Sequence, residues 1–154
     1  IGTSMAGRPW FQEATAVGAI SVSDLYYSQL EGRHTVAYTC PVRNDANQVI
    51  GYFSSRFNWE YIYDILDSAR SGQKGDIKII NKDGYVIACP SRQGILQDNV
   101  STIEAARCAM RGETYGYTLE DDRYGNTRIY GYAHTRGYNA YKGKQWSALV
   151  SEII

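Results

Sequence analysis

The sequence has no long hydrophobic segment and few of the residues that most metal and redox sites need. Its longest apolar run, Ala14–Ile20, is far shorter than the roughly 20 residues that a membrane-spanning helix requires. Three cysteines without CxxC spacing and two histidines are a poor set for a structural zinc site. We therefore predict no metal and no cofactor. The spacing is compatible with a disulfide between Cys89 and Cys108, and equally with three free thiols.

An excess of charge of either sign is also absent. Sixteen basic and sixteen acidic residues cancel, whereas proteins that bind nucleic acid or an anionic membrane usually carry a surplus of lysine and arginine. No GxSxG motif occurs, and His34 and Cys40 are six residues apart, which is ~20 Å along an extended strand. We therefore expect neither a nucleic-acid partner nor an enzyme. Because the chain begins with Ile1, we expect it to be part of a longer protein.

Tyrosine is abundant, with 14 copies in 154 residues, and it suits strands and half-polar pockets. Aromatic and β-branched runs alternate with polar, turn-forming residues, and Asp83-Gly84 is typical of a hairpin between Asp76–Asn81 and Tyr85–Cys89. The other predicted strands are Ile20–Ser28, Thr35–Val42, Val49–Phe57, Thr114–Leu119, Arg128–His134 and Gln145–Ile153.

Three helices are predicted between these strands. One opens within Gly7–Phe11, where Pro9 suits the first helical turn, and ends near Gly18. A second covers Trp59–Arg70, and a third covers Ser101–Arg111, with Ser101 as its N-cap and Glu104 at the capping-box position. The order of elements predicts an α+β fold of two antiparallel-sheet units joined by a helix. We place the boundary in the linker-like stretch before Gly75, giving modules 1–72 and 73–154.

Strand alternation places polar side chains together on one sheet face. In the first predicted strand these are Asp24, Tyr26 and Ser28, and in the third they include Ser54 and Arg56. Such groups are costly to bury without partners, so the face is either exposed to water or lines a pocket that a ligand completes. We favour the pocket. An internal salt bridge between Arg56 and Asp24 is the alternative interpretation.

Several motifs together resemble the Cache domain, an extracytoplasmic sensor of bacterial chemoreceptors, sensor kinases and cyclic-dinucleotide signalling proteins. They are Arg8-Pro9-Trp10-Phe11, the strand ending Asp24–Ser28, Pro41-Val42, Gly51–Phe57, Asp83-Gly84 and the final Gly131-Tyr132-Ala133 to Val150. Together, and in this order, the motifs span nearly the whole chain.

The resemblance implies two PAS-like modules, of which 1–72 is the membrane-distal, ligand-binding one and 73–154 the membrane-proximal one. The long first helix and initial strand pair of such domains have no counterpart here, so the distal module is expected to be incomplete or a shorter variant. The family implies a periplasmic or extracellular domain of an inner-membrane receptor, a homodimer when complete, which binds a small molecule and performs no chemistry. A module that binds no small molecule is the alternative.

In amino-acid-sensing members the Arg-x-Trp-aromatic motif holds the ligand carboxylate, and Arg8, Trp10 and Phe11 match it. The two acidic positions that hold the ammonium fall on Ser28 and Arg56. The predicted ligand is therefore a small mono- or dicarboxylate, with an amino acid or amine as the alternative. The predicted ligand-binding residues are Arg8, Trp10, Phe11, Asp24, Tyr26, Ser28, Tyr38 and Arg56.

The last strand carries a further prediction. Trp146, Ala148 and Val150 are every second residue of this strand, and strand alternation puts every second residue on one side of a sheet. We therefore expect these three side chains to share a core face in the second module.

Overall fold

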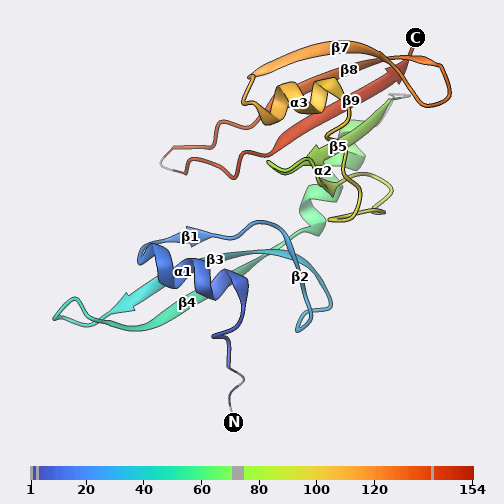
Figure 1. The fold of residues 1–154 in the computed structure, drawn as a ribbon. Helices are drawn as coiled ribbons and strands as arrows, with labels where there is room; N and C mark the ends of the chain where they lie inside the picture. Colours follow the sequence, from blue (N-terminus) through green and yellow to red (C-terminus); the bar gives the residue numbers. More distant parts are fainter. Residues whose placement is uncertain (1, 3, 71–74, 140) are drawn as a thin grey trace. The chain divides into compact units, whose positions relative to one another are not determined.

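The computed structural model describes residues 2, 4–70, 75–139 and 141–154. The chain divides into two compact units, Ile1–Trp59 and Glu60–Ile154, and each contains an antiparallel sheet with a helix packed against it (Figure 1). The module boundary predicted between residues 72 and 73 lies outside the described residues. The prediction of two antiparallel sheets with flanking helices is confirmed.

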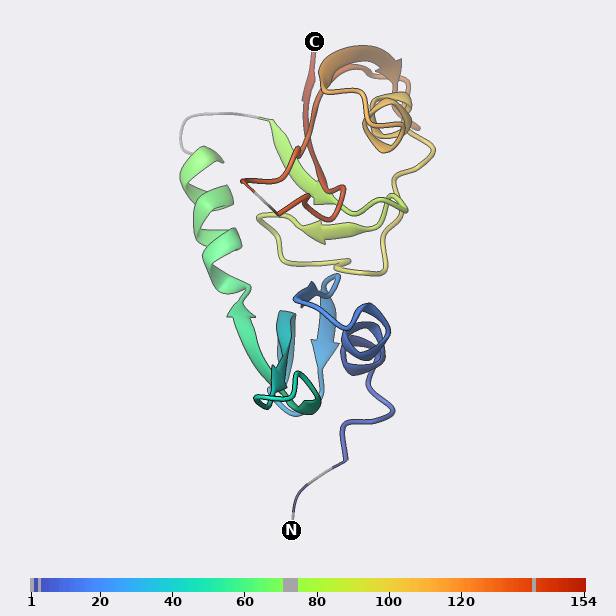
Figure 2. The same cartoon turned by 90° about the vertical axis from the view of Figure 1, so that its left-hand side faces the viewer.

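The first unit is a sheet centred on its longest strand. Along one edge of β3 runs β4, and along the other edge run β1 and then β2, all antiparallel to β3. Helix α1 lies against one face of this sheet (Figure 1 and Figure 2) and buries Ala14 completely. The elements are α1 (Pro9–Val17), β1 (Ser21–Val22), β2 (Tyr26–Ser28), β3 (Arg33–Arg43) and β4 (Val49–Asn58).

The ends of α1 follow from two residues. Pro9 occupies the first helical position, where its missing N–H costs no hydrogen bond. Gly18 adopts a left-handed conformation, with φ 63°, and its N–H donates to the Ala14 carbonyl oxygen. This is the conformation that glycine adopts without steric cost. The predicted helix bounds are confirmed.

The strand predicted at Ile20–Ser28 is two short strands instead of one. Ser21 pairs with Thr39 of β3, whereas Tyr26 pairs with Thr35, so the edge has one residue more than a continuous ladder would contain. An extra residue of this kind is a bulge, and it reverses the inward–outward alternation. Tyr26 therefore shares a face with Ser21 and not with its predicted neighbour Asp24, which lies in the break between β1 and β2.

The second unit has a five-stranded sheet in the order β6-β5-β9-β8-β7. Helix α3 packs against β7, β8 and β9. The predicted hairpin joins β5 and β6, and Gly84 supplies the positive φ of 82° that its turn requires. The elements are α2 (Glu60–Arg70), β5 (Asp76–Ile80), β6 (Val86–Ala88), α3 (Glu104–Met110), β7 (Tyr115–Asp121), β8 (Thr127–His134) and β9 (Ser147–Ile153).

The N-terminus of α3 is capped from the sheet and not by a local side chain. The predicted start at Ser101 is wrong, because α3 begins at Glu104 after Ile103, whose side chain forms no cap. The Glu120 carboxylate of β7 accepts hydrogen bonds from the backbone N–H groups of Glu104 (2.9 Å) and Ala105 (3.2 Å). A carboxylate there satisfies orphan donors and complements the helix dipole, so the tertiary contact sets the start of the helix.

Strand β9 presents the opposite face from the one predicted. Ser147, Leu149 and Ser151 are buried, whereas Val150 is 38% exposed, so the expected core face of Trp146, Ala148 and Val150 is wrong. Both alternating sets of this strand carry apolar residues, and the position of α3 decides between them. Leu149 is aligned with buried Tyr132 of β8 on the inner face.

Two further features concern the cysteines and the lengths of the helices. Cys40, Cys89 and Cys108 are all free, so the disulfide considered between Cys89 and Cys108 is not formed. Among the described residues, no helix has the length and apolar character needed to cross a membrane.

Candidate functional site

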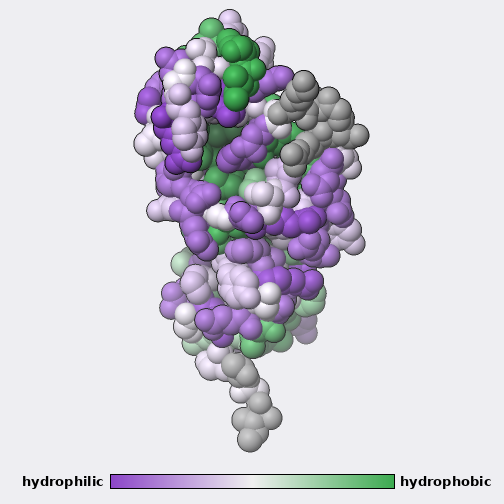
Figure 3. All heavy atoms as spheres, turned by 90° about the vertical axis from the view of Figure 1, so that its right-hand side faces the viewer, coloured by the Kyte–Doolittle hydropathy of each residue, from purple (hydrophilic) through white to green (hydrophobic). Residues whose placement is uncertain are grey.

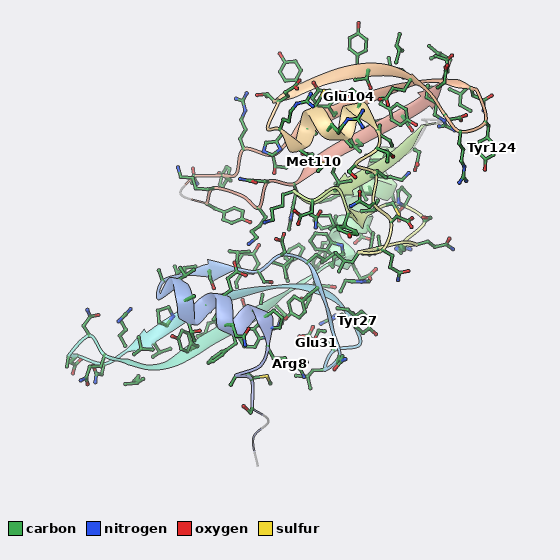
Figure 4. The ribbon with its side chains drawn as sticks, viewed as in Figure 1. Arg8, Tyr27, Glu31, Glu104, Met110 and Tyr124 are labelled. Carbon is green, nitrogen blue, oxygen red and sulfur yellow. The ribbon has the colours of Figure 1, made fainter. Side chains whose placement is uncertain are left out.

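A cavity of about 200 Å³ lies in the first unit, between the start of α1 and the turn that joins β2 to β3. Figure 4 labels Arg8, Tyr27 and Glu31, three of the residues that surround it. The β1–β2 bulge turns Tyr26 and Ser28 to the face that also carries Arg56. The polar and aromatic side chains that line the cavity include Arg8, Trp10, Tyr26, Tyr27, Ser28, Glu31 and Arg56.

Arg56 is held against this face from several sides. Its guanidinium carbon lies 4.3 Å from the centre of the Trp10 ring, close enough for a cation–π interaction. Its Nη1 donates to the Ser54 hydroxyl and to the Ser55 carbonyl oxygen (3.2 Å). Ser54 in turn shares a hydrogen bond of 2.9 Å with Thr39 of β3. The guanidinium is therefore oriented before any ligand arrives.

Tyr26 carries the one buried side-chain polar atom without a hydrogen-bond partner in the described part of the chain, its phenolic hydroxyl. Buried polar atoms are nearly always paired, and an unpaired one costs free energy. Burial raises the pKa of Tyr26, and Glu31 adds to this, while the positive charge of Arg56, a hydrogen-bonding contact from Arg56 and the positive charge of Arg8 oppose it. The hydroxyl therefore stays protonated and is a donor that lacks an acceptor.

Glu31 belongs to the cavity, although the sequence indicated only a turn around it. Its carboxylate lies 3.1 Å from Nε of Arg33 and 3.9 Å from Nε of Arg56. Glu31 is thus the counter-charge to Arg56, the role that the alternative interpretation gave to Asp24. No signal in the sequence placed Glu31 there, because strand alternation assigns no face to a residue in a turn.

Three of the predicted ligand-binding residues do not line the cavity. Phe11 packs edge-on against Tyr52, with ring centres 5.3 Å apart. Asp24 lies in the break that the bulge creates. Tyr38 is 42% exposed and lies on the opposite face of β3, because it pairs with Ser55. The structure brings the other five together: Arg8, Trp10, Tyr26, Ser28 and Arg56.

The arrangement suits an anionic group. Within the described residues the Arg8 guanidinium makes no hydrogen bond or ion pair, so its planar fork is available to a carboxylate. Tyr26 and Ser28 add hydroxyls, and Trp10 adds an aromatic wall. No cluster of three His, Cys, Asp or Glu side chains that could hold a metal occurs among the described residues.

Comparison with known proteins finds likeness in structure alone. The sequence matches no protein-family model and no curated protein. The fold matches the periplasmic sensory domain of the Campylobacter jejuni chemoreceptor Tlp1, with a TM-score of 0.75 and 18% identity over 97% of this chain and 56% of that one. It also matches the ligand-binding domain of the Pseudomonas aeruginosa chemoreceptor PctB, solved with L-Gln. Here the TM-score is 0.68 and the identity 20%, over 97% of this chain and 57% of that one.

A third match is a methyl-accepting chemotaxis protein, with a TM-score of 0.76 and 14% identity over 99% of this chain and 57% of that one. The chain therefore spans little more than half the length of each of these solved domains. At these identities the likeness establishes the fold. The α+β architecture is that of extracellular and periplasmic sensory domains, as the Cache resemblance predicts.

Proposed function

We propose that this chain, which has the fold of extracytoplasmic sensory domains, is the small-molecule-binding part of a bacterial transmembrane receptor and that its ligand is a small organic carboxylate. The ligand occupies the cavity of the first unit. Its carboxylate accepts from Arg8 and from the Tyr26 hydroxyl, with Arg56 and Ser28 beside it. The cavity, at about 200 Å³, is smaller than the ~300–1,000 Å³ of drug-sized sites, so the ligand is a compact metabolite.

The unpartnered Tyr26 hydroxyl carries this proposal. It is buried next to two arginines, which can only donate hydrogen bonds, so its O–H has no acceptor among the described residues. A ligand oxygen would provide the missing acceptor and would also neutralise positive charge from Arg8. Bidentate contact between a guanidinium and a carboxylate is among the stronger hydrogen-bonded interactions.

An α-amino acid is the second candidate, and Glu31 favours it. A carboxylate on the same cavity wall can accept from a ligand ammonium group and neutralise its charge, whereas neither Ser28 nor Arg56 carries a negative charge. The structural neighbour PctB was solved with L-Gln and with L-Arg. For this chain, however, Glu31 is already shared between Arg33 and Arg56, so the simple carboxylate remains the first candidate.

The receptor role follows from binding. A ligand that binds only the folded, ligand-ready state shifts the population toward that state. In the complete protein this shift would pass across the inner membrane, with the domain outside the cytoplasm and the receptor a homodimer. The proposal assigns no chemical reaction to the chain.

Isothermal titration calorimetry with lactate, pyruvate, succinate and a panel of L-amino acids tests the ligand class. We expect at least one carboxylate to bind, and Arg8→Met to weaken that binding at least tenfold, which is about 1.4 kcal/mol. Arg43→Met is the matched control, because Arg43 lies at the other end of β3 and, among the described residues, its guanidinium bonds only to the carbonyl oxygens of Asn47 and Gly18. It should leave the affinity unchanged.

Glu31→Gln separates the two candidates. An amino acid loses the acceptor for its ammonium group and binds more weakly, whereas a simple carboxylate loses only a repulsive neighbour and binds equally or more tightly. A chain that binds none of these compounds, or that binds them equally well after Arg8→Met, is a module without this ligand site.

A further inference from the structure

A second and larger cavity lies in the second unit and is lined by other residues than the first. Its volume is about 560 Å³, and β5, β8, β9 and the β7–β8 turn form its walls. Figure 4 labels Glu104, at the start of α3, and Tyr124, which lies in that turn and lines the cavity. Figure 3 shows a hollow in the second unit, with hydrophobic residues at its base and hydrophilic residues around it.

The carboxylates in the wall of this cavity are already engaged by the protein. Glu120 accepts from the first N–H groups of α3 and from the Thr118 hydroxyl (2.6 Å). Asp121 accepts from Thr127 at 2.9 Å. Asp122 lies 3.0 Å from Nε of Arg128 and also accepts from backbone N–H groups of its own turn. Asp76 is paired with Lys78.

The donors of the wall are less fully used. Among the described residues, Arg128 donates only through Nε, so its two terminal nitrogens have no partner. The hydroxyls of Tyr130 and Ser151 likewise form no hydrogen bond there. Lys78 bonds to Asp76 alone and is 30% exposed. The cavity therefore offers spare donors and three cations, of which Arg123 lies over the Tyr124 ring, while its four carboxylates are engaged by the protein.

The register of the sheet orders these donors. Ser151 of β9 pairs with Asp76 of β5 on one side and with Tyr130 of β8 on the other. Lys78 is aligned with Leu149 of β9 and Arg128 with Ile153. The two cations thus project from strands on either side of β9 and four residues apart along it, with their Cα atoms about 16 Å apart at a strand spacing of ~4.8 Å and ~3.3 Å per residue. The two hydroxyls lie between the two cations. An elongated ligand with an anionic group at each end fits this spacing better than a compact ion does.

We propose that the second unit binds a small organic dianion, such as a dicarboxylate, with one carboxylate at Lys78, the other at Arg128, and the Tyr130 and Ser151 hydroxyls between them. This site is separate from the site of the first unit and does not depend on it. The electrostatics agree with the geometry. Burial lowers the pKa of Lys78 and Arg128 lowers it further, while Cys89 and Asp98 oppose the shift, so an anion between the two cations relieves a repulsion.

The test uses succinate and the full chain carrying Arg8→Met, which disables the first site. Amide NMR shifts are followed as succinate is added, with acetate as the monoanion. We expect saturable shifts at Lys78, Tyr130 and Ser151 with succinate, and at least tenfold weaker binding of acetate. Adding Lys78→Met should weaken succinate binding at least tenfold. Lys82→Met, an exposed lysine in the β5–β6 turn, is the matched control and should have no effect.

Tyr130→Phe keeps the test decisive if Lys78→Met does not fold, because it removes only a hydroxyl; we expect a severalfold loss of succinate affinity. Succinate that causes no saturable shift in the Arg8→Met chain, or that binds equally well after these changes, overturns the second site. In that case carboxylate binding by the unmodified chain still supports the first site. If only the second site binds, the proposed function of the first unit fails and this inference stands.

Discussion

Each of the two units has a polar cavity on one face of its sheet, but the polar side chains around the two cavities have different roles. In the second unit the polar groups around the cavity mostly hold the fold together: Glu120 caps α3 and Asp122 orders a turn. In the first unit the Arg8 guanidinium has no such role among the described residues. Tyr26 has no partner, and Arg56 lies 3.9 Å from its nearest carboxylate. The difference shows that a buried polar group indicates a ligand only when the fold itself gives that group no hydrogen-bond partner.

The largest expected effect tests which face of the second sheet is core. Leu149→Ala should reduce the free energy of unfolding by ~2–5 kcal/mol, because it truncates a buried side chain, and Leu149 is only 3% exposed. The neighbouring Val150→Ala should cost less than ~1 kcal/mol, as expected for a more exposed residue. Urea denaturation followed by circular dichroism measures both. A larger loss of stability for Val150→Ala than for Leu149→Ala would show that the face of Trp146, Ala148 and Val150 is the core face after all.

The next effect tests whether Glu120 is structural. Glu120→Ala should destabilise the chain by ~0.5–2 kcal/mol, the range for loss of an N-cap, and should speed hydrogen exchange at the amides of Glu104 and Ala105. Glu152→Ala, at an exposed position of β9, should change stability by less than ~0.5 kcal/mol. Equal effects of the two substitutions would place Glu120 among the groups free to bind a ligand.

Asp122 gives the second unit a pH dependence. Its hydrogen bond with Arg128, and then bonds from the backbone of Asn126 and Tyr124, hold the pKa of Asp122 well below its usual range. A carboxyl with a depressed folded pKa stabilises the fold above its unfolded pKa of ~3.9 and loses that contribution as the pH falls through the folded pKa.

Stability should therefore decrease more steeply below about pH 4 in the unmodified chain than in Asp122→Asn. Thermal unfolding at a series of pH values measures the difference, which should vanish at the acid end. Parallel curves for the two proteins would show that Asp122 does not order the turn.

The smallest expected effect is the most informative about the first unit. Tyr26→Phe removes a hydroxyl that has no protein partner, so stability without ligand should change by less than ~0.5 kcal/mol. Tyr132→Phe is the matched variant in the second unit. It removes a 2.7 Å hydrogen bond to Glu113 and should cost ~1 kcal/mol. A loss for Tyr26→Phe as large as that for Tyr132→Phe would remove the reason for a ligand there.

The sequence predicted those features that local chemistry decides. Pro9 and Gly18 set the bounds of α1, and Asp83-Gly84 set the hairpin, because each acts through its own backbone. The alternation along β4 correctly placed Ser54 and Arg56 on one face. Of the eight predicted site residues, the five that line the cavity come from α1, β2, β4 and the residue before α1.

The sequence did not predict features that depend on a partner element. The bulge that displaced Asp24 exists only when β1 and β2 both pair with β3. The inner face of β9 depends on where α3 packs, and the cap of α3 comes from β7, 16 residues away along the chain from Glu104. Glu31 enters the cavity through a turn, and a turn has no alternation from which a face could be assigned.

The fixation of Arg56 has a consequence for how the ligand preference of this domain can change. Trp10, Ser54 and Ser55 all hold its guanidinium, so replacing Arg56 disturbs the contact between α1 and the sheet as well as the cavity. Arg8 has no such attachment within the described residues. Replacing Arg8 should therefore change ligand binding at a smaller cost in folding stability than replacing Arg56, because only Arg56 also joins α1 to the sheet.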